Sequence, residues 1–218
     1  MKLNAVVLGA SGLVGAELLA LLLDHVAFAD IYIYVRKKLP ISHNKLHQIV
    51  TDFKDLNTLT LPQGVNVIFS CLGTTNKNRP DKKQYRYVEY HIPLHFAHIA
   101  KQQNVQQFHV VSAMGSNKHS GNFYTKLKGE VEEALESVGI SNLNIYRPSL
   151  LVGKRNENRP LERWMIAAMK VVNPLLRGPL KKYRSISAKQ VALAMLNQAV
   201  KQKQGTYIFN SEEIKQLS

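Results

Sequence analysis

The sequence predicts an α/β fold in which a doubly wound parallel sheet carries helices on both faces. Short apolar runs alternate with helix-forming stretches along almost the whole chain, and a glycine-rich turn follows the first run. The composition is 45% hydrophobic and 20% charged, which excludes disordered and collagen-like proteins. With 218 residues, the chain is expected to form one domain, 1–218.

The elements can be placed in order from their apolar patterns. Strands are expected at Leu3–Leu8, Ile31–Val35, His47–Thr51, Val65–Cys71, Gln107–Val111, Leu143–Tyr146 and Thr206–Phe209. Helices are expected at Leu13–Leu23, Lys82–Gln103, Tyr124–Ser137 and Ala188–Val200. The strand runs are short and apolar, which is typical of a parallel sheet buried between helices. The stretch 150–185 contains three prolines and an uneven pattern, so it is expected to be a small C-terminal insertion on the substrate side.

The chain is strongly basic, with 29 Lys and Arg against 15 Asp and Glu and a net charge of +14. This balance favours anionic ligands. Residues 154–184 contain nine Lys or Arg and two Glu, a net charge of +7. Three interpretations stay open: a cap over an anionic small-molecule substrate, a peripheral membrane or protein contact, or a solvated face. No nucleic-acid-binding motif is present, so specific nucleic-acid binding is not expected.

Cysteine and histidine usage limits the remaining classes of site. Cys71 is the single cysteine, which excludes an intrachain disulfide and a cysteine-based zinc site. Among the histidines, His91, His95 and His98 come nearest to a metal-binding pattern but lack an acidic partner, so no metal is expected. A reducing, cytoplasmic location is expected, although Ala27-Phe28-Ala29 resembles a signal-peptidase site. A monomer and a homodimer both remain open.

A glycine motif follows the first expected strand and opens the first expected helix. It has the form GxxGxxG and consists of Gly9, Ala10, Ser11, Gly12, Leu13, Val14 and Gly15. In this context the first glycine permits a tight turn, the second lets the backbone approach a pyrophosphate, and the third lets the helix pack on the strand. The helix N-terminus offers free amides to the phosphate charge. The motif therefore predicts a Rossmann-type dinucleotide site, the alternative being a glycine turn without a ligand.

The end of the second expected strand indicates which dinucleotide is bound. An acid usually occupies this position and binds the ribose hydroxyls. Here the strand continues into Arg36, Lys37 and Lys38. A guanidinium can grip a 2′-phosphate, which a carboxylate would repel. We therefore expect NADP, with NAD as the less favoured cofactor, unless these charges form a solvated loop.

Tyr124 and Lys128 are four residues apart on an expected helix and therefore share a face. An ammonium group near a phenol favours the phenolate, so we expect Lys128 to lower the pKa of Tyr124 and suit it to acid–base catalysis. Ser112 follows the fifth strand and could bind the same substrate oxygen. Tyr34 and Lys38 have equal spacing, but Tyr34 lies on an expected strand, where four residues span about 13 Å, so local geometry does not bring the two together. The alternative is that Tyr124 is only a surface tyrosine.

These motifs, in this order, resemble the short-chain dehydrogenase/reductase superfamily. Cys71-Leu72-Gly73-Thr74-Thr75, Asn122-Phe123-Tyr124 with Lys126-Leu127-Lys128-Gly129-Glu130, and Tyr146-Arg147-Pro148-Ser149 narrow the resemblance. They are similar to the atypical branch that includes Tat-interacting oxidoreductases and bacterial NAD(P)-binding proteins labelled as nucleoside-diphosphate-sugar epimerases. The similarity is good over residues 1–153 and loose beyond.

The resemblance implies roles for several side chains. Tyr124 would protonate the substrate oxygen, Ser112 would orient it, and Lys128 would hold the nicotinamide ribose. Asp52 and Phe53 would flank the adenine, with Leu72 and Gly73 lining the adenosine side. The main branch completes its proton relay with an asparagine in the helix after the fourth strand. That neighbourhood here holds Glu89, Tyr90 and His91.

Two functions follow from these observations. The first is an NADP-dependent oxidoreductase that transfers a hydride between NADPH and a carbonyl or hydroxyl group. The second is an NADPH-binding regulatory or scaffold protein with little or no turnover. Ser112, Tyr124 and Lys128 favour the enzyme, because a sensor does not need an acid–base tyrosine.

Overall fold

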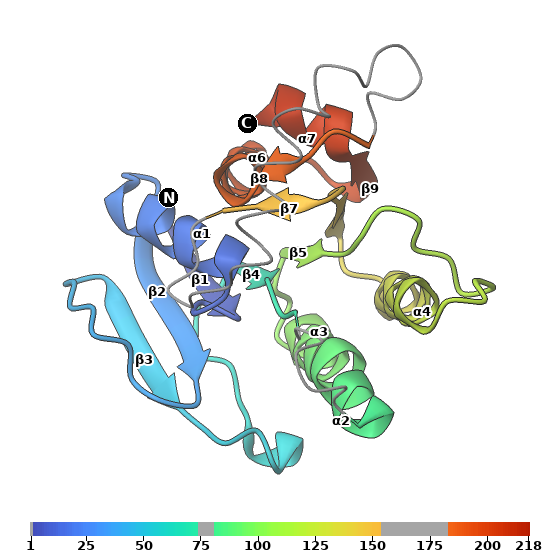
Figure 1. Ribbon diagram of the computed structural model, residues 1–218. Helices are drawn as coiled ribbons and strands as arrows, with labels where there is room; N and C mark the ends of the chain where they lie inside the picture. Colours follow the sequence, from blue (N-terminus) through green and yellow to red (C-terminus); the bar gives the residue numbers. More distant parts are fainter. Residues whose placement is uncertain (1, 74–80, 154–182) are drawn as a thin grey trace.

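The computed structural model describes residues 2–73, 81–153 and 183–218 (Figure 1). Its main sheet contains seven parallel strands in the order β3-β2-β1-β4-β5-β6-β9. These are β1 (Leu3–Leu8), β2 (Phe28–Val35), β3 (Leu46–Val50), β4 (Val67–Ser70), β5 (Gln107–Val111), β6 (Asn142–Arg147) and β9 (Gly205–Asn210). The α/β Rossmann-type prediction is confirmed.

Helices cover both faces of the sheet (Figure 1). One face carries α1 (Leu13–Asp24), α6 (Ala188–Lys201) and α7 (Ser211–Leu217). The other carries α2 (Lys82–Arg86), the π-helical turn η2 (Tyr87–His91), α3 (Ile92–Gln102) and α4 (Phe123–Val138). The strand order reverses between β1 and β4, and open α/β sheets bind ligands at the carboxyl ends of the strands at such a switch point.

Alternate side chains of the central strands enter two separate hydrophobic clusters. Val7 of β1 packs in one cluster with Leu18 of α1. Its neighbour Leu8 packs in the other cluster with Phe96 of α3. All four side chains are fully buried. Because both faces of β1 are covered, the strand is apolar at every one of these positions, and this is the pattern that made it recognisable in the sequence.

The helix expected at 82–103 is interrupted by the π-helical turn η2. The Ile92 amide donates to the carbonyl of Tyr87, five residues earlier. Pro93 follows at the start of α3 and has no amide hydrogen to offer the carbonyl of Glu89, four residues earlier. Pro93 is therefore placed where an ordinary α-helical ladder would be broken, and the helix shifts its register there.

Further elements were not predicted. A short parallel pair, β7 (Leu151–Val152) and β8 (Ile186–Ser187), lies at the two ends of the expected insertion 150–185. A 3₁₀ turn, η1 (Leu56–Thr58), follows β3, and α7 follows the last strand. Most of the insertion, including the basic stretch 154–182, lies outside the described residues, so its role stays a prediction. In the described ranges, no helix is both long enough and apolar enough to span a membrane.

Candidate active site

The glycine turn lies between β1 and α1 at the carboxyl edge of the sheet. Gly9 has φ +79°, a left-handed conformation that favours glycine, and its carbonyl accepts a 2.9 Å bond from the Gly12 amide. Gly12 caps α1 with no side-chain hydrogen bond to the first amides. The N-terminus of α1 therefore keeps amides available to an anion, as a pyrophosphate site requires.

The third glycine of the motif fixes the contact between α1 and β1. A Cβ at Gly15 would lie 2.1 Å from the Gly9 carbonyl oxygen. A Cβ at Gly9 would lie 2.6 Å from the Cys71 carbonyl oxygen at the end of β4. Ala10 and Val14 are buried in the core, so any ligand contact from them must be through the backbone. The loop is thus packed tightly against its own strand and the end of β4, and an expected dinucleotide would meet its backbone.

The side chains of the loop differ in exposure. Ser11 is exposed, and Leu13 is half-buried. Leu13 faces Gly153, where a Cβ would lie 2.7 Å from its Cδ1 atom. Ser11 is thus the residue of the motif that can offer a hydroxyl to solvent or to a ligand.

The basic residues after β2 lie at the same edge as the glycine turn. Leu8 of β1 pairs with Tyr34 of β2, so the two strands end at the same level. Arg36 and Lys37 follow directly and are exposed. The structure thus places both cations beside the loop, as an interaction with a 2′-phosphate would need.

The two residues expected at the adenine follow β3. The Asp52 carboxylate accepts a 3.0 Å hydrogen bond from the Lys54 amide and forms an ion pair with Lys54 Nζ at 3.1 Å. These contacts lower the pKa of Asp52. Phe53 has φ 57°, an uncommon conformation for an aromatic residue, and its carbonyl accepts a 2.6 Å bond from Tyr87 Oη. The hydrogen bond from Tyr87 of η2 therefore fixes the conformation of this turn.

Leu72 and Gly73 follow β4, next to the glycine turn. The Cys71 amide donates to the Leu8 carbonyl at 2.9 Å, which continues the β1–β4 pairing. Leu72 is half-buried against the core, and Gly73 is exposed. Both lie at the switch point between β1 and β4, and their expected role in lining the adenosine side stays a prediction. Thr74 and Thr75 of the motif lie outside the described residues.

Tyr124 lies in the first turn of α4. The Asn122 side chain caps the helix by accepting bonds from the amides of Tyr124, at 2.9 Å, and Thr125, at 3.3 Å. The residue is 41% exposed, and its ring meets the buried Tyr85 edge-on at 6.4 Å between centroids. Tyr124 is therefore supported on one side and open to a ligand on the other.

Lys128, one turn later, is buried beside the end of β5. Its Nζ donates to the Val111 carbonyl at 3.1 Å and pairs with Glu89 Oε2 of η2 at 2.7 Å. The side chains of Lys128 and Glu89 are only 7% and 1% exposed. Burial alone would lower the pKa of Lys128, but the charges of Glu89 and Tyr124, a hydrogen bond to Glu89 and, last, the charge of Glu132 raise it overall.

The structure reverses the expected direction of the Tyr124 pKa. Burial raises it, and the Glu89 charge adds to the rise; Lys128 acts in the expected, lowering sense without overcoming them. The prediction of a lowered pKa was therefore wrong, because burial of the phenol outweighs the Lys128 charge and Glu89 adds to the rise, neither of which the spacing of Tyr124 and Lys128 reveals. In this state Tyr124 is a protonated phenol at neutral pH, a proton donor rather than a base.

Ser112 is not joined to Tyr124 by a hydrogen bond within the described part of the chain. Its hydroxyl donates to the Glu132 carboxylate and lies 2.9 Å from Ser116 Oγ. Glu132 is buried and also accepts a 3.0 Å bond from Arg147 Nε. Ser112 thus belongs to a buried polar network, and its role toward a substrate stays a prediction.

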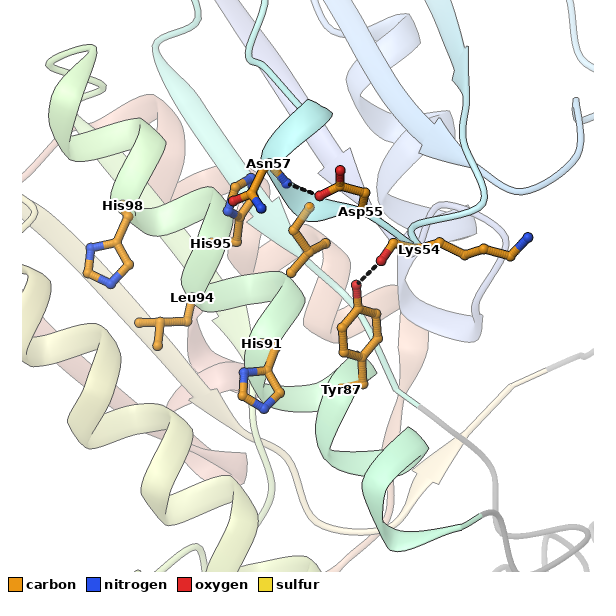
Figure 2. Close-up of a pocket in the computed structure, with 9 residues that line it drawn as sticks. Lys54, Asp55, Asn57, Tyr87, His91, Leu94, His95 and His98 are labelled. Atoms are coloured by element: carbon orange, nitrogen blue, oxygen red, sulfur yellow. Dashed lines mark hydrogen bonds between the residues drawn. The ribbon is translucent and has the colours of Figure 1, made fainter.

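The three neighbouring histidines lie outside this site. His91, His95 and His98 border an open groove of about 570 Å³ between α3 and the 54–57 turn (Figure 2). In the ranges that the structure describes, no group of three or more His, Cys, Asp or Glu is placed to hold a metal ion. None of the residues expected to bind the cofactor or substrate lines this groove.

Comparison with known proteins decides the family. The NAD(P)H-binding family model matches residues 9–160. The mitochondrial protein FMP52 of Eremothecium gossypii is 33% identical over 153 residues, which are 70% of this chain and 68% of that protein. Protein HTATIP2 of Rattus norvegicus is 34% identical over 163 residues, which are 73% of this chain and 66% of that protein. The chain belongs to the NAD(P)H-binding atypical short-chain dehydrogenase/reductase family.

Solved structures show the same fold at low sequence identity. The Bordetella bronchiseptica enzyme WbmH in complex with NAD⁺ has a TM-score of 0.71 at 18% identity, covering 99% of this chain and 78% of that one. The UDP-N-acetylglucosamine 4-epimerase of Methanobrevibacter ruminantium has a TM-score of 0.69 at 18% identity, covering 96% and 77%. At this identity the likeness shows the fold of this family member and not its substrate.

Sequence reasoning missed two residues of this site. Glu89 was noted only as a neighbour of the place where the main branch has an asparagine, and Tyr85 was not singled out. Both are buried against the Tyr124–Lys128 pair. The available signal was the spacing of Glu89, four residues after Tyr85 in one expected helix. That spacing does not reveal that both side chains contact α4.

Proposed function

We propose that this protein is an NADP-dependent oxidoreductase that reduces a carbonyl group to an alcohol, or catalyses the reverse reaction, with Tyr124 as the acid. The observation that carries the proposal is the placement of Tyr124, open to a ligand, one helical turn from a buried, charged Lys128. The match to the NAD(P)H-binding family supports the binding of this cofactor. The glycines let the loop pack closely against its own strand and the end of β4, and the N-terminus of α1, which no side chain caps, supports the binding of a dinucleotide there.

The chemistry divides between the cofactor and the chain. When bound, the nicotinamide supplies or accepts a hydride at the substrate carbon. In the reducing direction, Tyr124 donates its phenolic proton to the substrate oxygen, and the carbonyl becomes an alcohol. Lys128 has three N–H donors, of which Glu89 and Val111 take two. The third has no partner among residues 2–73, 81–153 and 183–218, so it could bind a ribose hydroxyl or the Tyr124 oxygen.

Support for NADP over NAD comes from the end of β2. Arg36 and Lys37 are exposed beside the glycine turn, and no acid follows Val35. A guanidinium binds a phosphate through two parallel hydrogen bonds, which gives Arg36 a geometry that Lys37 lacks. The preference is therefore assigned mainly to Arg36.

The test is a screen of aldehydes and ketones with NADPH. We expect the wild type to reduce at least one compound and Tyr124→Phe to lose at least about 100-fold in rate, the lower range for general acid catalysis. Tyr207→Phe, a change on β9, is the matched control and should keep the wild-type rate.

The same screen separates the regulatory alternative. The protein would be a sensor or scaffold if it binds NADPH in equilibrium dialysis but reduces no compound. In that case the Tyr124→Phe variant should bind NADPH as tightly as the wild type does. An unchanged rate in Tyr124→Phe would remove Tyr124 from the reaction.

A further inference from the structure

The buried ion pair of Glu89 and Lys128 lies on the interior side of the proposed reaction site, and stability alone does not explain it. Glu89 and Lys128 come from different elements, η2 and α4, and approach to 2.7 Å with side chains 1% and 7% exposed. Removing two charges from water costs several kcal/mol per ion, and apolar residues of similar volume often stabilise a core as well or better. The pair is therefore weak as a source of stability, and its position beside Tyr124 suggests another use.

The local backbone directs Glu89 toward α4. Glu89 is at the centre of the π-helical turn, in which the Ile92 amide reaches back to the Tyr87 carbonyl. Such turns are uncommon and occur frequently at functional sites. Glu89 is buried, while its neighbours Val88 and Tyr90 are half-buried. The shifted register thus places one carboxylate, and not its neighbours, in the interior.

Glu89 also interacts with Tyr85, the aromatic residue whose ring meets that of Tyr124. Tyr85 is 8% exposed and lies one turn before Glu89 on α2. Burial raises the pKa of Tyr85, and the charge of Glu89 and a hydrogen bond to it contribute further. The carboxylate therefore interacts with both Lys128 and Tyr85, the two side chains that flank Tyr124 from the interior.

We propose that Glu89 is a positioning residue of the proposed reaction: its carboxylate keeps the buried Lys128 protonated and fixed, and leaves for the site one N–H that no other described residue takes. The catalytic consequence rests on the proposed function, but the effect on Lys128 does not. Without the Glu89 charge, Tyr124 and the more weakly acting Glu132 still face Lys128, but burial is the largest single influence on this amine and favours its neutral form. A neutral Lys128 would be a poorer donor to a ribose hydroxyl and would no longer attract the developing charge on the Tyr124 oxygen.

The first experiment measures Lys128 directly, by NMR titration of protein labelled with ¹⁵N at the lysine Nζ atoms. Lys128→Arg identifies the signal. We expect the Lys128 pKa to fall by at least about two units in Glu89→Gln, since fully buried amines shift by up to about 3–5 units. In Glu89→Asp, where the carboxylate is one methylene shorter, it should fall by at least half a unit.

Glu130→Gln is the matched control. Glu130 lies on α4 and pairs with Arg86 of α2, so its loss removes a helix–helix ion pair of greater exposure. The Lys128 pKa should not change in this variant. A Lys128 pKa in Glu89→Gln within half a unit of the wild-type value overturns the proposal. If Glu89→Gln does not fold, an unchanged pKa in Glu89→Asp overturns it instead.

The second experiment follows kcat for carbonyl reduction against pH. In Glu89→Gln, kcat should fall as pH rises through the lowered Lys128 pKa, while wild type and Glu130→Gln keep their rate over that range. A pH-independent loss would indicate a merely structural role and contradict the proposal. If no variant reduces any carbonyl compound, the proposed function fails, and the lysine titration still decides whether Glu89 controls Lys128.

Discussion

Alanine substitutions in the glycine motif should separate cofactor binding from folding. In Gly15→Ala, the new Cβ would lie 2.1 Å from the Gly9 carbonyl oxygen and 2.8 Å from its carbon, so α1 must move away from β1. Overpacking of this kind costs about 1–3 kcal/mol. For a chain of this size, each kcal/mol lowers Tm by about 2–4 °C, which gives a fall of about 2–12 °C.

Gly12→Ala should behave differently. Its Cβ would lie 3.1 Å from the same oxygen, its φ of −80° suits alanine, and a shift of a few tenths of an ångström relieves the contact. We expect a stability within about 1 kcal/mol of wild type, because a less flexible unfolded chain offsets part of the cost. The methyl group would nevertheless occupy the space in which the backbone meets the pyrophosphate.

The assay is thermal unfolding with and without NADPH. At 100 times Kd, the cofactor stabilises the wild type by about 2.7 kcal/mol, or about 5–11 °C in Tm. Gly121→Ala, whose Cβ would meet nothing within 4 Å, should keep both the Tm and the NADPH shift. Gly12→Ala should keep the Tm and lose the shift. A full NADPH shift in Gly12→Ala would refute the assignment of the pyrophosphate to this loop.

Two further predictions concern cofactor choice and acid stability. NADPH should raise Tm more than NADH at equal concentration, and Arg36→Ala should remove the difference; equal shifts in wild type would contradict the NADP assignment. Burial lowers the pKa of His109 from 6.5 to about 3, so the unfolded chain binds this proton first and stability is lost as pH falls from 6.5 toward 3. At about 1.36 kcal/mol per unit the loss approaches about 5 kcal/mol, and denaturant unfolding of His109→Gln should show a shallower decline than wild type.

The strands were predictable because their environment is uniform. β1 and β5 lie between two helical layers, and every described side chain of these two strands except Asn4 is buried, so their sequences are short and mainly apolar, with Asn4 in β1 and the buried Gln107 and His109 in β5 as the polar exceptions. The glycine spacing and the Tyr124–Lys128 spacing are likewise local patterns. The helix α7 was missed although Asn210 and Glu213 form the start of a capping pattern, and the Asn210 amide does donate to Glu213 at 2.7 Å.

The contacts that define the acid–base chemistry were not predictable from spacing. Glu89 and Lys128 are 39 residues apart, and Ser112 and Glu132 are 20 apart, so neither contact follows from a helical or strand period. The π-helical turn at Glu89 adds a change of register that a 3.6-residue pattern does not reveal. The predicted direction of the Tyr124 pKa was wrong mainly because the phenol is buried, with the Glu89 charge adding to the rise, although both members of the expected pair were correctly placed on one helix.

The position of Lys128 depends in turn on its neighbour Gly129, a residue without chemistry of its own. A Cβ at Gly129 would lie 2.3 Å from the Lys118 amide nitrogen, so α4 lies directly against the 115–120 turn. With the helix this close, Lys128 reaches both the Val111 carbonyl of β5 and the Glu89 carboxylate of η2. The lysine is thus fixed by three elements at once, because close packing of α4, the end of a strand and a shifted helical turn all meet at its ammonium group. Tyr124, on the same helix and one turn earlier, takes its place at the sheet edge from the same packing.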